Sequence, residues 1–213
     1  TLGPLIHNPQ LIEDLNTKGV PCRESLDEFQ AGETVVFRSH GVGPDVYEAA
    51  HAKNLTILDA TCPNVKAAQK KGQALAEAGY LPVIIGEKNH PEVKAVLSYG
   101  KPIPVVQNLE ELKNGNFDTN KEYSFVIQKT FDNIKFDEIK SYATKTFKSA
   151  TFKDDLCGAT YERQEAISML AKEVDVVIVI GGNMSSNTQK LYKISKGLNE
   201  NSYLIGESKE IDK

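Results

Sequence analysis

Short apolar runs alternate with helix-forming segments along most of the chain. The apolar runs are residues 5–6, 34–37, 55–58, 81–85, 103–106, 123–127, 176–180 and 203–205. The segments between them are rich in Ala, Leu, Lys, Gln and Glu: 9–19, 45–53, 64–79, 91–99, 108–113, 136–143, 161–173 and 188–197. Strands that alternate with helices are typical of βα units, so the sequence predicts an α/β protein with mostly parallel sheets.

One arrangement recurs where these runs end. An apolar run enters a polar turn that bears His or Cys, and a helix then begins at or near a proline. The arrangement occurs at His7, His40, Cys62 and His90 and, without a proline, at Cys157 and Ser185. In open α/β sheets, ligands bind beyond the carboxyl ends of the strands, where helix N-termini hold anions. The sequence therefore predicts one site formed by these turns.

The side chains at these turns suit an anion. They are His7, His40 and His90, and the consecutive residues Ser185, Ser186 and Asn187. Each of them taken alone is also explained as a solvated loop residue or a helix cap. Their coincidence at equivalent positions favours a neutral to cationic cradle for a phosphate or diphosphate.

Each of two further polar residues can be explained either by a structural role or by a chemical one. Glu92 lies in the first turn of the helix after His90, where it either compensates the helix dipole or donates a proton beside a bound anion. Thr130 ends a strand, where it is either a cap or part of the same site.

Cys62 and Cys157 each stand just before a predicted helix. The positive end of a helix dipole stabilises a thiolate, which suits a nucleophile or a metal ligand. No C-x-x-C is present, which disfavours a zinc ribbon, and two thiolates are fewer than the three or four that iron–sulfur clusters use. Cys22 has no helix start after it, and we expect it to be a buried, inert thiol.

Composition limits the range of partners. The 213 residues carry a net charge of −4, so nothing favours binding to nucleic-acid phosphates. The longest apolar run, 176–180, is far shorter than the roughly 20 residues that span a bilayer. Three widely spaced cysteines do not form the disulfide framework of a secreted protein, and the first residues do not have the pattern of a signal peptide. We therefore expect a cytoplasmic protein without a membrane partner. The sequence begins without Met and in the middle of the strand–helix pattern, so we also expect it to be a fragment.

Five short motifs make the chain recognisable. The runs 3–9 (GPLIHNP), 39–42 (SHGV), 59–63 (DATCP), 90–93 (HPEV) and 185–188 (SSNT) occur in this order. With them the whole chain resembles the IspH/LytB family of 4-hydroxy-3-methylbut-2-enyl diphosphate reductases. The resemblance implies three αβ lobes in a pseudo-threefold arrangement around a central [4Fe-4S] cluster. It also implies reductive removal of a hydroxyl from a diphosphate substrate, giving isopentenyl and dimethylallyl diphosphate in the last step of the methylerythritol phosphate route, with ferredoxin or flavodoxin as the electron donor.

The resemblance also assigns roles to residues. Cys62 and Cys157 would ligate the cluster, and Glu92 with Thr130 would handle the proton that leaves with the hydroxyl as water. An iron without a protein ligand would bind that hydroxyl as a Lewis acid. The diphosphate would be held by His7, His40, His90, Ser185 and Asn187, with Ser186 and Thr130 beside them.

The chain departs from the family pattern in three places. The first cluster cysteine of the family has no counterpart here, because Cys22 does not match it. A later serine that binds diphosphate would lie beyond Lys213, and Gln128-Lys129 replaces the usual Gln-Thr before Thr130. We therefore expect the central and larger part of the enzyme, which would lose the cluster and be inactive when expressed alone.

The expected lobes are residues 1–61, with the N-terminal part missing, 62–154, and 155–213, with the C-terminal part missing. Two other interpretations remain open. One is a cluster-free diphosphate-binding module or pseudoenzyme that kept the cradle. The other is a phosphosugar-binding domain, suggested by the glycines and serines at 181–186, which would leave the two cysteine turns unexplained.

Overall fold

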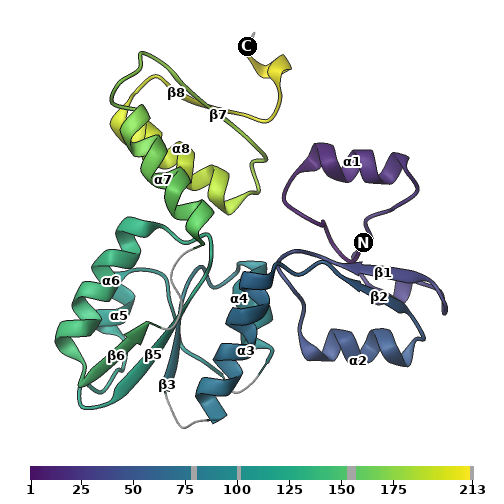
Figure 1. The fold of residues 1–213 in the computed structure, drawn as a ribbon, viewed down its shortest axis with the longest axis horizontal. Coiled ribbons are helices and arrows are strands. Elements are labelled where there is room, and N and C mark those ends of the chain that lie inside the picture. The colour runs from purple at the N-terminus through teal and green to yellow at the C-terminus, as the bar shows by residue number, and fades with distance from the viewer. Residues whose placement is uncertain (78–80, 100–101, 153–156, 212–213) are drawn as a thin grey trace.

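Three separate parallel sheets organise the chain (Figure 1). The computed structural model describes residues 1–77, 81–99, 102–152 and 157–211. Every strand pair in these residues is parallel, which confirms the predicted α/β class. Each sheet lies inside one of the expected lobes 1–61, 62–154 and 155–213, but the lobe boundaries and the pseudo-threefold arrangement stay predictions.

The first sheet pairs β1 with β2. Its elements are α1 (Pro9–Thr17), the 3-10 turn η1 (Leu26–Glu28), β1 (Thr34–Phe37), α2 (Pro44–Ala52) and β2 (Thr56–Asp59). The helices α1 and α2 lie on opposite sides of this sheet (Figure 1). Phe29, Val35, Phe37 and Ala50 form its buried core.

The expected strand at 5–6 is absent from the described structure. Leu2 instead bridges Arg23 and Phe37, and the chain then leaves the sheet. Gly3 has a left-handed φ of +68°, and Pro4 has no N–H to donate to a neighbouring strand. The turn that carries His7 therefore starts earlier than the apolar pattern predicts.

The second sheet has the strand order β4-β3-β5-β6. Its elements are α3 (Pro63–Glu77), β3 (Leu81–Ile85), α4 (Pro91–Leu97), β4 (Val105–Val106), α5 (Leu109–Asn114), β5 (Glu122–Ile127), α6 (Asn133–Thr146) and β6 (Ser149–Phe152). Alternate residues of the central strands face opposite ways, as a pleated strand requires. Ile84 packs toward α4 and Val126 toward α3, whereas Val83 and Phe125 pack among the aromatic residues that α6 covers. Figure 1 shows α3 and α4 on one face and α5 and α6 on the other.

The third sheet pairs β7 with β8. Its elements are α7 (Gly158–Leu170), β7 (Val177–Ile180), α8 (Ser186–Leu198), β8 (Ser202–Ile205) and the 3-10 turn η2 (Ser208–Glu210). Val177 and Val179 face the two helices and are buried, while Ile178 and Ile180 face outward and are exposed.

The predicted elements differ from the structure mainly at their ends. The edge strand β6 was not predicted, because Ser149 to Phe152 is half-buried and has no continuous apolar run. The helix predicted at 136–143 begins three residues earlier and ends three later, and the one predicted at 91–99 ends at Leu97. The end of the predicted 64–79 helix and the residues just before the Cys157 turn fall on 78–80 and 153–156, outside the described residues. No helix of the described chain is long and apolar enough to cross a bilayer.

Candidate functional site

Three histidines from three different turns meet at the carboxyl ends of the strands. The ring centroid of His7 lies 4.5 Å from that of His40 and 6.4 Å from that of His90, and the rings of His40 and His90 are 5.5 Å apart. One nitrogen of each ring lies within 4.8 Å of the other two. The predicted convergence of these turns is therefore present, and we call the three side chains the histidine cluster.

His90 has a defined orientation within this cluster. It is the N-cap residue of α4, and its Nδ1 accepts a hydrogen bond from the Glu92 N–H at 3.2 Å. In the neutral imidazole the proton must therefore reside on Nε2, which can donate it to a ligand. The buried Nδ1 of His40 has no hydrogen-bond partner among the described residues.

Burial keeps the histidine cluster uncharged. It lowers the pKa of His40 to about 3, with further contributions from the two other rings and from the nearby Arg38 guanidinium. Burial lowers the pKa of His90 to about 4, although the Glu87 carboxylate acts in the opposite direction. The pKa of His7 is lowered by burial and by Arg38. A bound anion would reverse these shifts, because a negative charge nearby favours the protonated imidazole.

Glu92 is buried next to the histidine cluster. Its side chain is 3% exposed, and Oε1 accepts a hydrogen bond from the Lys129 N–H at 2.8 Å. Burial raises the pKa of Glu92 to about 7, although the Lys129 N–H and ammonium act in the opposite direction. A carboxyl group with this pKa can give up a proton at neutral pH. Thr130 is the next residue after Lys129. Its hydroxyl oxygen accepts a hydrogen bond from Gln128 Nε2 at 3.0 Å, so the hydroxyl proton remains free to be donated to a ligand.

The N-terminus of α8 supplies the serines and the asparagine. Ser185 is the N-cap residue and accepts a hydrogen bond from the Thr188 N–H, while Asn187 Oδ1 is buried with no partner in the described structure. A Cβ on Gly182 would lie 2.4 Å from the His7 carbonyl oxygen, so the turn after β7 rests directly on the turn that carries His7. A cavity of about 820 Å³ is lined by His7, His90 and Ser186 among others. The third sheet therefore brings α8 to the histidine cluster.

The two cysteine turns also approach each other. Cys62 precedes α3, and its N–H donates to the Ser39 carbonyl at 3.0 Å, next to His40. Cys157 is the N-cap residue of α7, and the Asn64 amide in the first turn of α3 lies 3.8 Å from its Sγ. Both thiols are free and partly exposed. Cys22, expected to be buried, is also partly exposed, because it lies in an irregular segment near the surface.

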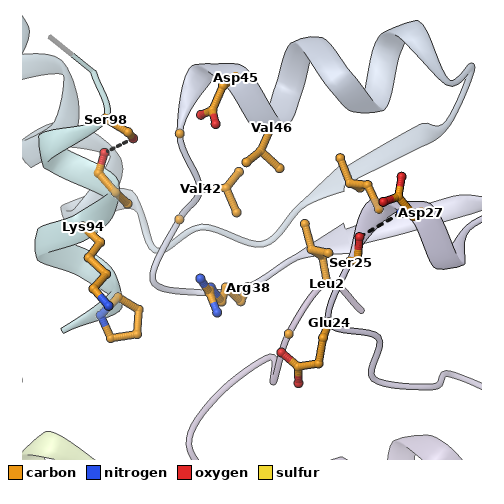
Figure 2. A pocket seen from close by; sticks show the side chains of 16 residues that line it. Leu2, Glu24, Ser25, Asp27, Arg38, Val42, Asp45, Val46, Lys94 and Ser98 are labelled. Carbon is orange, nitrogen blue, oxygen red and sulfur yellow. Dashed lines mark hydrogen bonds between the residues drawn. The ribbon is translucent and has the colours of Figure 1, made fainter. Parts of the chain in front are cut away.

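Arg38 and Lys190 are two cations at this site that sequence reasoning missed. Arg38 lines a second cavity, of about 530 Å³, whose lining includes none of the three histidines. Figure 2 shows its guanidinium opposite Lys94 of α4. Its Nε is buried and has no hydrogen-bond partner among the described residues. Lys190 lies one turn into α8, with its ammonium buried against the turns of the second sheet. Arg38 stands two residues before His40, and that proximity was the only sign of it in the sequence.

These features define an α/β protein in which three histidines, the start of α8, a buried carboxyl group and two thiols are brought together by the turns after parallel strands. Comparison with known proteins identifies the family within this class of α/β proteins. A family model described as "LytB protein" matches residues 1–213. The chain belongs to the LytB family.

Relatives with the name 4-hydroxy-3-methylbut-2-enyl diphosphate reductase support this membership. One from Aquifex aeolicus is 43% identical over 99% of this chain and 73% of its own length. One from Helicobacter hepaticus is 36% identical over the whole chain and 77% of its own length. A relative of the same name from Fusobacterium nucleatum is 39% identical over 99% of this chain, which spans only 26% of that protein.

Two solved structures share the fold. One, titled as (E)-4-hydroxy-3-methyl-but-2-enyl diphosphate reductase, the terminal enzyme of the non-mevalonate pathway, is 41% identical. It has a TM-score of 0.71 over 99% of this chain and 75% of its own. The E-1-hydroxy-2-methyl-but-2-enyl-4-diphosphate reductase of Plasmodium falciparum is 28% identical, with a TM-score of 0.90 over 98% of this chain and 68% of its own.

Proposed function

We propose that this chain is the larger part of a 4-hydroxy-3-methylbut-2-enyl diphosphate reductase. The reaction breaks the carbon–oxygen bond of the 4-hydroxyl group, takes up two electrons and two protons, and releases water with isopentenyl and dimethylallyl diphosphate. The observation that carries the proposal is the histidine cluster, in which one nitrogen of each ring lies within 4.8 Å of the other two and His90 contacts the backbone of the buried Glu92. Membership in a reductase family supports it independently.

In this proposal the diphosphate is held by the histidine cluster and by the start of α8. Neutral imidazoles donate N–H groups to phosphate oxygens, and their protonation on binding adds charge attraction. Ser185, Ser186 and Asn187 lie where the positive end of the α8 dipole favours an anion. The shared cavity beside His7 and His90 supports this arrangement.

Glu92 is the proton donor in this proposal. Its pKa of about 7 keeps much of it protonated at neutral pH, so it can protonate the departing hydroxyl. Thr130, with a hydroxyl proton free to donate, orients the same oxygen. Burial excludes bulk water from Glu92, which keeps its proton for the substrate.

Cys62 and Cys157 fit two of the ligands of an iron–sulfur cluster. Both are free, partly exposed thiols at helix N-termini, and Asn64 joins the two turns. Clusters take three or four thiolates, so the remaining ligands come from outside this pair. When bound, a [4Fe-4S] cluster supplies electrons one at a time and a Lewis-acidic iron. Ferredoxin or flavodoxin would be the electron donor, and the free thiols favour a reducing, cytoplasmic location.

Anaerobic purification of the full-length protein with an iron count tests this proposal. We expect Cys62→Ser and Cys157→Ser to lose most of the iron, because each removes a ligand. Cys22→Ser is the matched control and should keep it. Iron content unchanged by Cys62→Ser would contradict the assignment.

The second candidate is a cluster-free diphosphate-binding module. The observation that favours it is the contrast between three converged histidines and only two cysteines at the site. It predicts a colourless protein that binds diphosphate and has no redox activity, so the same iron count separates the two functions.

A further inference from the structure

Lys190 joins three turns that lie far apart in the sequence. Its Nζ lies 2.9 Å from Glu87 Oε1, 2.7 Å from the Thr130 carbonyl oxygen and 2.8 Å from Ser186 Oγ. The side chain is 9% exposed and passes over the ring of Phe131, 5.6 Å from its centroid. A lysine on a helix ordinarily points into solvent, so this burial needs an explanation.

The three contacts compensate for the burial of the ammonium. An ammonium has three N–H donors, and here each has an acceptor. Burial lowers the pKa of Lys190, while the Glu87 carboxylate acts in the opposite direction. Because one acceptor is a carboxylate, the pair avoids the large cost of an isolated buried charge.

The acceptors belong to turns that carry the proposed site. Glu87 lies three residues before His90, and the Thr130 carbonyl belongs to the turn after β5 whose Lys129 N–H contacts Glu92. Ser186 is the first residue of α8, the helix that connects the two strands of the third sheet. Lys190 therefore connects the anion-binding helix of one sheet to two turns of another.

The contact with Ser186 also sets the direction of its hydroxyl group. Lys190 can only donate, so Ser186 Oγ must accept, and the hydroxyl proton points away from the ammonium. A hydroxyl that accepts from a cation becomes a stronger donor. Ser186 is thus prepared to donate to an anion in the cavity that it shares with His7 and His90.

We propose that Lys190 is a positioning residue that holds the start of α8 and the Ser186 hydroxyl against the histidine cluster for a diphosphate ligand. This role rests on the proposed function. Lys190 lines the same cavity, but its three N–H donors are already taken by Glu87, Thr130 and Ser186, so it acts through Ser186 and the turns that it joins.

The test measures binding of inorganic diphosphate to the full-length protein by isothermal titration calorimetry. Lys190→Met should raise the Kd roughly tenfold to a hundredfold, the range for losing hydrogen bonds of a charged group. Lys190→Arg, which keeps the charge and the donors, should recover most of the affinity. Lys193→Met is the matched control, because Lys193 lines the same cavity from the next turn of α8 and is exposed. An equal loss in the two Met variants would show a general charge effect and overturn the proposal.

A double-mutant cycle separates positioning from stability. In a Ser186→Ala background, Lys190→Met should have much less effect on the Kd, because the hydroxyl that it orients is gone. A full, additive effect would overturn the proposal. Lys190→Gln keeps an amide donor without the charge, so it serves where Lys190→Met does not fold. It should raise the Kd in the wild-type background and have little effect in the Ser186→Ala background, and an unchanged Kd in the wild-type background would overturn the proposal.

The outcomes also separate this role from the function on which it rests. A wild-type protein that does not bind diphosphate refutes the proposed function and this role together. Wild-type binding with an unchanged Kd in Lys190→Met refutes only the role of Lys190.

Discussion

Replacing Glu92 with Gln should make the folded protein more stable at alkaline pH. The carboxyl group is 3% exposed, and Oε1 accepts the Lys129 N–H. Gln has the same shape and keeps an oxygen acceptor for that N–H, but it never ionises. The substitution therefore removes the cost of burying a charge and leaves the packing in place.

The magnitude follows from the pKa of Glu92. Burial raises it from 4.5 to about 7, which corresponds to about 3 kcal/mol at roughly 1.4 kcal/mol per pH unit. Below pH 4.5 the carboxyl group is protonated in the folded and the unfolded state, so it contributes no difference. As the pH rises from 4.5 through 7, the unfolded state ionises first and the folded state loses stability. At pH 8 we expect Glu92→Gln to exceed the wild type by about 1–3 kcal/mol, with no gain at pH 4.5.

Urea denaturation of the full-length protein at several pH values measures this difference. The other titratable groups are present in both proteins, so the contributions that do not depend on Glu92 cancel when the two free energies of unfolding are subtracted. Glu48→Gln, at an exposed position on α2, is the control and should give a nearly constant difference. If the difference between Glu92→Gln and the wild type does not change from pH 4.5 to pH 8, the buried-carboxyl reasoning is wrong.

Two further predictions concern the anion site. Binding of inorganic diphosphate near pH 6 should take up protons, because the anion raises the lowered pKa values of His40 and His90. Calorimetry in buffers of different ionisation enthalpy measures this uptake. The same heat of binding in every buffer would contradict the prediction. Gly182→Ala should cost about 1–3 kcal/mol of stability and weaken diphosphate binding, because its Cβ would meet the His7 carbonyl oxygen at 2.4 Å. Gly197→Ala, with nothing within 4 Å, is the control and should leave binding unchanged.

The strand-to-helix turns were predictable because their signals are local. Pro9, Pro63 and Pro91 each begin a helix, and Asn8 and His90 cap the helices that follow them. A parallel sheet then brings the carboxyl ends of its strands to one edge, so the convergence of the histidines could be expected. The motif resemblance supplied what local signals could not, namely that the turns of this one predicted site belong to three separate lobes.

Lys190 and β6 could not be predicted because they depend on distant partners. Lys190 lies four residues after Ser186 on a polar helix, where a lysine is ordinarily solvated. Its burial depends on Glu87 and Thr130, which are 103 and 60 residues away in sequence. β6 becomes a strand by pairing with β5, although its own residues have no apolar run. Glu92 illustrates the same limit, because its position was predicted but its pKa follows from burial by the turn at Lys129.

Under the proposed function, the charges at this site would couple diphosphate binding to the protonation of Glu92. Without an anion, the buried imidazoles of His40 and His90 are neutral at pH 7, and Glu92, with a pKa of about 7, is only partly protonated. A diphosphate close to the histidine cluster raises the pKa of each nearby imidazole, and the same negative charge also raises the pKa of Glu92. Each imidazole gains a proton only in response to the field of the anion, so the added positive charge offsets that field without reversing it. Glu92 is therefore most fully protonated when a diphosphate is bound, which is when the proposed reaction needs its proton.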